Sequence, residues 1–116
     1  MKFTVSKRFS FEAAHSLPYL PKGHKCRNLH GHSYVVEIHC EGPLDSRGFV
    51  IDYAEISAAM APILAQLDHQ NIDEVLPCYT TAENLGAWIM DQLVAINPCR
   101  VDVYETAKTC VRVERT

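Results

Sequence analysis

Two segments near the start of the chain alternate between apolar and polar residues, and this alternation constrains the fold most strongly. A period of two residues is typical of a strand with one buried and one exposed face. In residues 2–11 the apolar phase holds Phe3, Val5, Phe9 and Phe11. In residues 32–41 the corresponding phase holds His32, Tyr34, Val36, Ile38 and Cys40. We therefore expect two half-buried strands, separated by a loop rich in polar residues.

After the turn-forming residues 42–48 the apolar spacing becomes helical. Asp52 and Glu55 form a capping box that predicts a helix over 53–67, interrupted or bent at Pro62. A second capping box, Thr80 with Glu83, predicts a helix that continues to the Asn97–Pro98 pair. Alternating valines then indicate two further strands, one near residue 102 and one near residue 112.

The order β-β-α-α-β-β predicts an α+β fold in one domain over residues 1–116, with an antiparallel four-stranded sheet and both helices on one face. The other face would be polar, and His39 on it is expected to be solvated. Such a sheet has two unpaired edges. Subunits that pair edge to edge would close a β-barrel lined by this face, whose predicted members are Lys2, Thr4, Ser6, Arg8, Glu37, His39 and Glu41.

Composition excludes several classes of protein. Charged residues make up 22% of the chain and hydrophobic residues 47%, as in soluble globular proteins. The net charge of -3 gives no basic footprint for nucleic acid, and no apolar run is long enough to span a membrane. The first residues lack a signal-peptide core, and the five cysteines lack a CxxC spacing, so we expect a cytoplasmic protein with reduced thiols.

Three histidines form a candidate metal site. His30 and His32 are two residues apart at the start of a predicted strand, so their imidazoles point to one face. His15 follows the first strand and can supply a third ligand. Three imidazoles with an open position are typical of catalytic zinc. Two other interpretations stay open: polar loop residues satisfied by hydrogen bonds, or a structural zinc with Cys26 as the fourth ligand.

Other residues carry candidate acid–base or binding chemistry. Basic neighbours favour the thiolate of Cys26, which suits a base or nucleophile, although an idle loop cysteine is also common. Asp68 can orient the adjacent His69, or each can contact a different group. Glu105 falls in the apolar phase of its strand and needs a partner, either a basic side chain or a heterocycle with two N–H donors.

Five motifs in order resemble the 6-pyruvoyltetrahydropterin synthase superfamily over nearly the whole chain: FSFEAAH, CRNLHGH, LDH, TTAEN and YET. The resemblance implies trimers that close a barrel and stack as a homohexamer, with active sites between subunits. It implies that His15, His30 and His32 bind Zn²⁺ and that Cys26, Asp68 and His69 are catalytic. It further implies that Glu105 anchors a pterin.

Cysteine followed by three residues and HGH resembles the queuosine-pathway branch, the 6-carboxytetrahydropterin synthases. That likeness implies a carbon–carbon lyase acting on 7,8-dihydroneopterin triphosphate, with release of acetaldehyde and triphosphate. Thr80 and Thr81 are further candidates for binding the pterin, and the basic candidates for the triphosphate are Lys22, Lys25 and Arg27. The alternatives are the 6-pyruvoyl reaction, without acetaldehyde, and a non-catalytic zinc-stabilised binding module.

Overall fold

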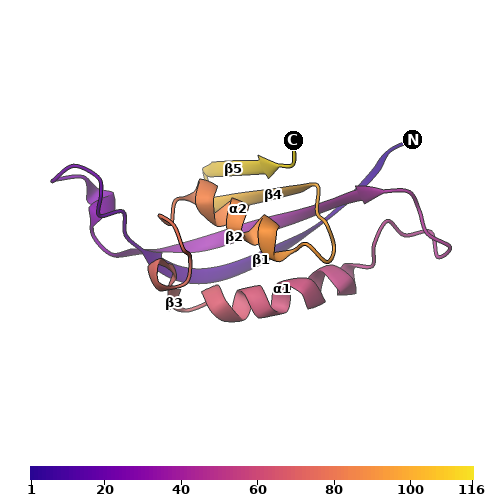
Figure 1. The fold of residues 1–116 in the computed structure, drawn as a ribbon, viewed down its shortest axis with the longest axis horizontal. Coiled ribbons are helices and arrows are strands. Elements are labelled where there is room, and N and C mark those ends of the chain that lie inside the picture. The colour runs from indigo at the N-terminus through magenta and orange to yellow at the C-terminus, as the bar shows by residue number, and fades with distance from the viewer.

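A computed structural model describes residues 1–116. It confirms the predicted order of two strands, two helices and two strands and adds short elements between them (Figure 1). The strands are β1 (Phe3–His15), β2 (His30–Gly42), β3 (Gln70–Asn71), β4 (Arg100–Thr106) and β5 (Thr109–Glu114), and the helices are α1 (Tyr53–Leu67) and α2 (Ala82–Gln92). Single 3₁₀ turns lie at Lys25–Arg27 and Ile72–Glu74.

The sheet has five strands in the order β3-β1-β2-β4-β5, so the predicted count of four is corrected. The additional strand β3 pairs parallel to the end of β1, at Ala13 and Ala14. The other neighbours are antiparallel, as expected. Because β3 has only two residues, it carries no alternation that a sequence pattern could detect.

Both helices cover one face of the sheet, as predicted (Figure 1). The core lies between them and the apolar phases of β2 and β4, where Tyr34, Val36, Ile38, Val101 and Val103 are fully buried. Asp52 caps α1 as predicted, its side chain accepting a hydrogen bond from the N–H of Ala54. None of the helices is long and apolar enough to cross a membrane.

Helix α2 differs from its prediction at both ends. Its N-cap is Thr81, whose Oγ1 accepts from the N–H of Asn84, and not Thr80. Thr80 is instead buried and bound to other segments, a competition that local sequence cannot reveal. The helix ends at Gln92, and residues 93–96 continue as turns towards Asn97, which has a φ of 46°.

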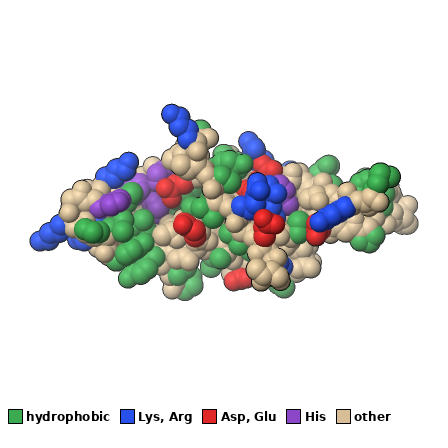
Figure 2. Space-filling model, turned by 90° about the horizontal axis from the view of Figure 1, so that it is seen from above, with side chains coloured by type: hydrophobic (Ala, Val, Ile, Leu, Met, Phe, Trp, Pro, Cys, Tyr) green, Lys and Arg blue, Asp and Glu red, His purple; other side chains and the backbone are tan.

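The opposite face of the sheet is polar, as predicted, and is covered by ion pairs. Lys2 pairs with Glu41 and Arg8 with Glu37 across β1 and β2. Acidic and basic side chains lie next to one another on the surface seen in Figure 2. The expectation that His39 is solvated is wrong, because it is 7% exposed and its Nε2 lies 3.1 Å from Oδ2 of Asp102.

The molecule is elongated, with extents of 56 × 25 × 24 Å, and β5 and most of β1 lack a neighbouring strand on their outer side. On the β1 edge only Ala13 and Ala14 have a partner, in β3. The N–H of Glu12 points outward to Asp68, so alternate residues back to Thr4 direct their N–H groups to this open edge.

Candidate functional site

The hairpin of β1 and β2 brings three imidazoles together at one end of the sheet. His15 is the last residue of β1 and lies directly opposite His30, the first residue of β2. His32 follows two residues later on the same face. The ring centroid of His15 lies 4.6 Å from that of His30 and 5.2 Å from that of His32. One nitrogen from each ring lies within 4.8 Å of the other two, as predicted from the spacing.

The hydrogen bonds of two rings leave the same nitrogen free. Nδ1 of His15 lies 2.8 Å from the carbonyl oxygen of Thr80, and Nδ1 of His30 lies 2.7 Å from that of Asn28. A carbonyl only accepts, so each Nδ1 carries a proton, and in the neutral form of each ring the lone pair lies on Nε2. Metal-binding histidines are usually oriented in this way.

Burial supports the same assignment. Nε2 of His15 and of His32 are buried without any hydrogen-bond partner, which is costly unless another group occupies the space between them. Burial also holds the pKa of His32 below its ordinary value; nearby Glu105 opposes this, while His15 and His30 reinforce it. In their neutral form, three imidazoles whose nitrogens converge in this way match the donor set of a tetrahedral zinc site with one open position.

Two residues hold His15 from behind. Thr80 is 1% exposed, and its Oγ1 lies 3.2 Å from Nδ1 of His15 and 2.6 Å from Oδ1 of Asp73. The other oxygen of Asp73 accepts from both the N–H and the hydroxyl of Ser16. Asp73 was missed in the sequence, where nothing distinguishes it from other surface carboxylates.

Glu105 reaches the histidines from β4. Its two carboxylate oxygens lie 3.5 Å from Nε2 of His32 and 3.8 Å from Nε2 of His15. The side chain is 28% exposed and also lines a pocket of about 290 Å³, together with Thr81, Glu83 and Cys110. A carboxylate between a metal site and an open pocket can bind a ligand that touches both. No arginine or lysine pairs with Glu105, and next to imidazoles whose Nε2 atoms carry lone pairs the carboxylate has no donor in this chain, so of the two predicted partners the heterocycle with two N–H donors stays open.

Cys26 lies in the loop between β1 and β2. The loop is fastened by a hydrogen bond from the N–H of Leu17 to the carbonyl of Cys26, and by Arg27, whose guanidinium donates to the carbonyls of Pro18 and Leu20. The thiol is partly exposed and is in no disulfide. It makes no hydrogen bond or ion pair with Asp68 or His69, so the structure does not join the predicted catalytic residues directly.

The Asp68–His69 pair lies at the edge of β1. Asp68 accepts from the N–H of Glu12 and lies 3.0 Å from Nδ1 of His69, and these bonds hold the pKa of Asp68 below its ordinary value. His69 has a φ of 59° and donates its N–H to the carbonyl of Glu12. Left-handed backbone in a non-glycine residue persists only where its surroundings fix it. The exposed imidazole shares a pocket with His32.

Glu37, His39 and Asp102 form a second group whose ligand atoms lie within 4.8 Å of one another. Both carboxylates of this group already have arginine partners. Arg8 pairs with Glu37, while Arg100 and Arg112 pair with Asp102. A cation at this place would have to displace guanidinium groups, so the three-histidine group is the better metal site.

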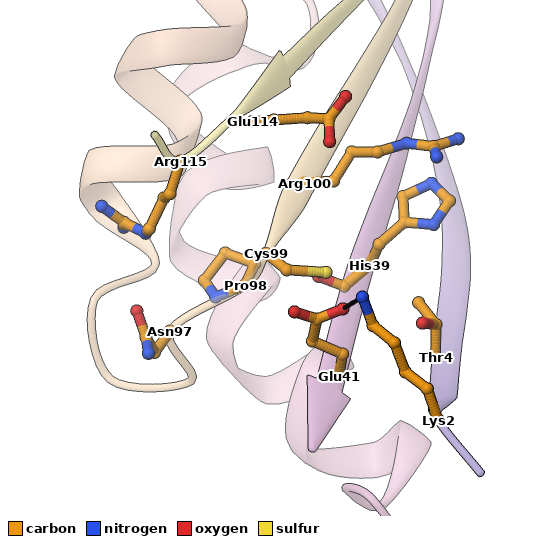
Figure 3. Close-up of a pocket in the computed structure, with 10 residues that line it drawn as sticks. All are labelled: Lys2, Thr4, His39, Glu41, Asn97, Pro98, Cys99, Arg100, Glu114 and Arg115. Carbon is orange, nitrogen blue, oxygen red and sulfur yellow. Dashed lines mark hydrogen bonds and ion pairs between the residues drawn. The ribbon is translucent and has the colours of Figure 1, made fainter.

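A further pocket, of about 500 Å³, lies at the end of the sheet away from His15, His30 and His32, and His39 is one of its lining residues (Figure 3). The ammonium of Lys2 and the carboxylate of Glu41 neutralise each other across its floor, 3.0 Å apart. The backbone of Pro98 and the thiol of Cys99 complete its wall. None of the three converging imidazoles lines it, so it is not part of the candidate metal site.

The fold and the site together define a class: small α+β proteins with three imidazoles that converge as a candidate metal centre at one end of the sheet. The profile of 6-pyruvoyl tetrahydropterin synthase matches residues 4–116. The chain belongs to that family, whose members include pterin synthases, and the resemblance seen in its motifs is confirmed.

Three similar proteins carry different names. A 6-carboxy-5,6,7,8-tetrahydropterin synthase of Synechocystis is 34% identical, covering 96% of this chain and 90% of the relative. A dihydroneopterin monophosphate aldolase of Pyrococcus furiosus is 31% identical, covering 80% and 76%. The structure of Caenorhabditis elegans 6-pyruvoyl tetrahydropterin synthase superposes with a TM-score of 0.89 at 26% identity, covering 100% of this chain and 97% of that one.

Proposed function

We propose that this protein is a zinc-dependent carbon–carbon lyase of the 6-carboxytetrahydropterin synthase type. It would convert 7,8-dihydroneopterin triphosphate and one water molecule to 6-carboxy-5,6,7,8-tetrahydropterin, acetaldehyde and triphosphate, as a step in queuosine biosynthesis in the cytoplasm. The observation that carries the proposal is the convergence of three imidazoles, two with buried and unpartnered Nε2 atoms, beside a carboxylate that faces a pocket. The similar Synechocystis enzyme supports the choice of reaction.

His15, His30 and His32 would hold the zinc ion, which supplies Lewis acidity towards the hydroxyls of the substrate side chain. Glu105 would accept hydrogen bonds from the 2-amino group and N3–H of the pterin, because a carboxylate matches two adjacent donors. Thr81 lines the same pocket and would add a further bond. Thr80 is buried and would support this wall from behind.

Cys26 would remove a proton from the substrate side chain, and His69, oriented by Asp68, would return one. Asp68 and His69 are separated from the thiol within one chain, so we propose that a neighbouring subunit brings a second pair to it, in a hexamer with active sites between subunits. Lys22 and Lys25 are exposed on the Cys26 loop and would contact the triphosphate. Arg27 is occupied by loop carbonyls and would act chiefly by holding that loop.

The first prediction tests the reaction. Zinc-loaded protein incubated with 7,8-dihydroneopterin triphosphate is expected to yield 6-carboxytetrahydropterin and acetaldehyde in equal amounts, measured by mass spectrometry. Cys26→Ala is expected to lose turnover by at least ~100-fold with its zinc content unchanged, because loss of a general base removes this much. Cys99→Ala, which changes a thiol at the far end of the sheet, is the matched control and is expected to be fully active.

Other products would assign the protein differently. A 6-pyruvoyl product without acetaldehyde would place it with the C. elegans type of enzyme. Turnover of a dihydroneopterin monophosphate, but not of the triphosphate, would favour the P. furiosus type. If Cys26→Ala lost zinc and stability together, the thiol would be a structural ligand, and the binding-module alternative would replace the enzyme.

A further inference from the structure

A chain of hydrogen bonds behind His15 has no role in the reaction just proposed. Nδ1–H of His15 donates to the carbonyl and, at longer range, to the hydroxyl oxygen of Thr80. That hydroxyl has one proton, which it donates to Oδ1 of Asp73 at 2.6 Å. The direction of every bond is therefore fixed, from imidazole to hydroxyl to carboxylate.

Each of the two carboxylate oxygens of Asp73 contacts a different segment next to His15. Its second oxygen, Oδ2, accepts from the N–H and the hydroxyl of Ser16 at 2.9 and 2.8 Å. Ser16 directly follows His15, so one carboxylate fixes both the backbone beyond the histidine and the group that its ring contacts. The 3₁₀ turn that carries Asp73 is itself anchored, because Ile72 is fully buried in the core.

From this geometry we infer that Asp73 is the positioning residue of the metal centre. It fixes the position of Thr80, whose carbonyl and hydroxyl oxygens accept from Nδ1–H of His15, and through the orientation of that ring it sets the affinity for a divalent cation. The inference rests on the proposed metal site and adds to it a residue that touches neither the metal nor the substrate. Its negative charge strengthens the hydrogen bond from Thr80, which in turn makes Thr80 Oγ1 a better acceptor for the imidazole N–H.

Zinc affinity of the full-length chain is the first measurement, made with Zn²⁺ in competition with a chromophoric chelator. Asp73→Ala and Thr80→Val are each expected to weaken binding by ~10–100-fold, the range found for groups that orient metal ligands. The double variant is expected to bind no more weakly than the weaker single one, because both substitutions break one chain. Thr80→Ser keeps the hydroxyl and is expected to restore the affinity.

Ile72→Val is the matched control, because it loosens the same turn without removing a hydrogen bond. It is expected to lower the unfolding midpoint and leave zinc affinity unchanged. If Asp73→Ala does not fold, Asp73→Asn provides the same test, since it keeps the shape of the side chain and removes the charge. The Nδ1–H proton resonance of His15 in zinc-free protein gives an independent readout, and it is expected to shift in the Asp73 variants because the hydrogen bonds from Nδ1–H to Thr80 become longer and less uniform.

Two results would overturn the inference in distinguishable ways. If Asp73→Ala and Thr80→Val bind zinc as tightly as the unchanged chain, while His15→Ala does not, the metal site stands and Asp73 has only a structural role. If the unchanged chain binds zinc no more tightly than His15→Ala, the metal site itself is refuted, and the proposed reaction and the role of Asp73 are lost together.

Discussion

Asp102 is the most heavily paired carboxylate of the polar face. It is 1% exposed and lies 2.8 Å from Arg100, 3.2 Å from Arg112 and 3.1 Å from His39. Burial alone would raise its pKa. The hydrogen bonds from the two arginines, with the charges of Arg100 and His39, outweigh burial and hold the pKa of Asp102 below its ordinary value.

This lowered pKa predicts how Asp102→Asn responds to pH. A carboxylate whose pKa is lower in the folded state contributes stability that is complete above its unfolded value and is lost as pH falls through the folded value. At neutral pH the variant is expected to be less stable by about 2 kcal/mol, below the range for fully buried pairs because both arginines are partly exposed. Its deficit should shrink below a pH of about 4.

Urea unfolding of both proteins between neutral and acidic pH measures this difference. Asp91→Asn, at an exposed position of α2, is the control and should leave stability unchanged. A deficit that is the same at every pH would show that Asp102 stabilises the sheet through its shape and not through its charge.

Residues that are close in sequence, or in phase on one strand, could be identified before the structure. The histidine site follows from the HxH spacing and from the position of His15 at a strand end. Asp73 and His39 could not be identified in this way. Asp73 contacts Ser16 across 57 positions, and His39 contacts Asp102 across 63 positions. Such pairings depend on the register of distant segments.

Among the elements, α2 packs most closely on the sheet. A Cβ atom at Gly86 would lie 2.8 Å from Cγ2 of Val113 and 3.2 Å from Cγ2 of Val103. Valine is stiff at χ1, so neither methyl group can turn away freely. Glycine is thus required here for the close approach of the helix to β4 and β5.

Gly86→Ala is expected to destabilise the protein by about 1 kcal/mol. Overpacking costs ~1–3 kcal/mol, and the higher helix propensity of alanine returns ~1 kcal/mol of this. The measurement is thermal or urea unfolding. Combining Gly86→Ala with Val113→Ala should cost less than the sum of the two single changes, because the second substitution vacates the space that the first one needs. Strict additivity would rule out the proposed contact as the cause.

At the scale of the elements, the sequence predicted the alternating strands and α1 well. Each strand carries its own period of two residues, and α1 carries its own helical spacing and its own cap. The start of α2 was predicted one residue early. Thr80 and Thr81 are both suitable caps, and the contacts of Thr80 with Asp73 and His15 decide between them. A preference that depends on packing has no local signal.

For the whole molecule the open edges matter most. An elongated sheet with two unpaired edges exposes rows of N–H and C=O groups that are available to another chain. The barrel and hexamer implied by the resemblance would pair these edges. They stay predictions, because the structure describes a single chain.

Ser6→Pro tests pairing through the β1 edge. The N–H of Ser6 points to the open side, so proline there should spare the pairing of β1 with β2. By light scattering, the unchanged protein is expected at about six times the 13.1 kDa of one chain. Ser6→Pro is expected at a lower mass with unchanged circular dichroism, and Ser6→Ala at the full mass. A full-mass Ser6→Pro protein would mean that this edge is not an interface.

The direct opposition of His15 and His30 across the first hairpin has a consequence for folding. If β1 slipped by one residue against β2, one set of imidazoles would turn to the opposite face, and the three nitrogens would no longer meet. Only correctly aligned chains can then bind a metal ion tightly. Metal binding would therefore stabilise correctly aligned chains relative to chains in which β1 and β2 are misaligned. The ion would thus select the register of the hairpin before it takes part in any reaction.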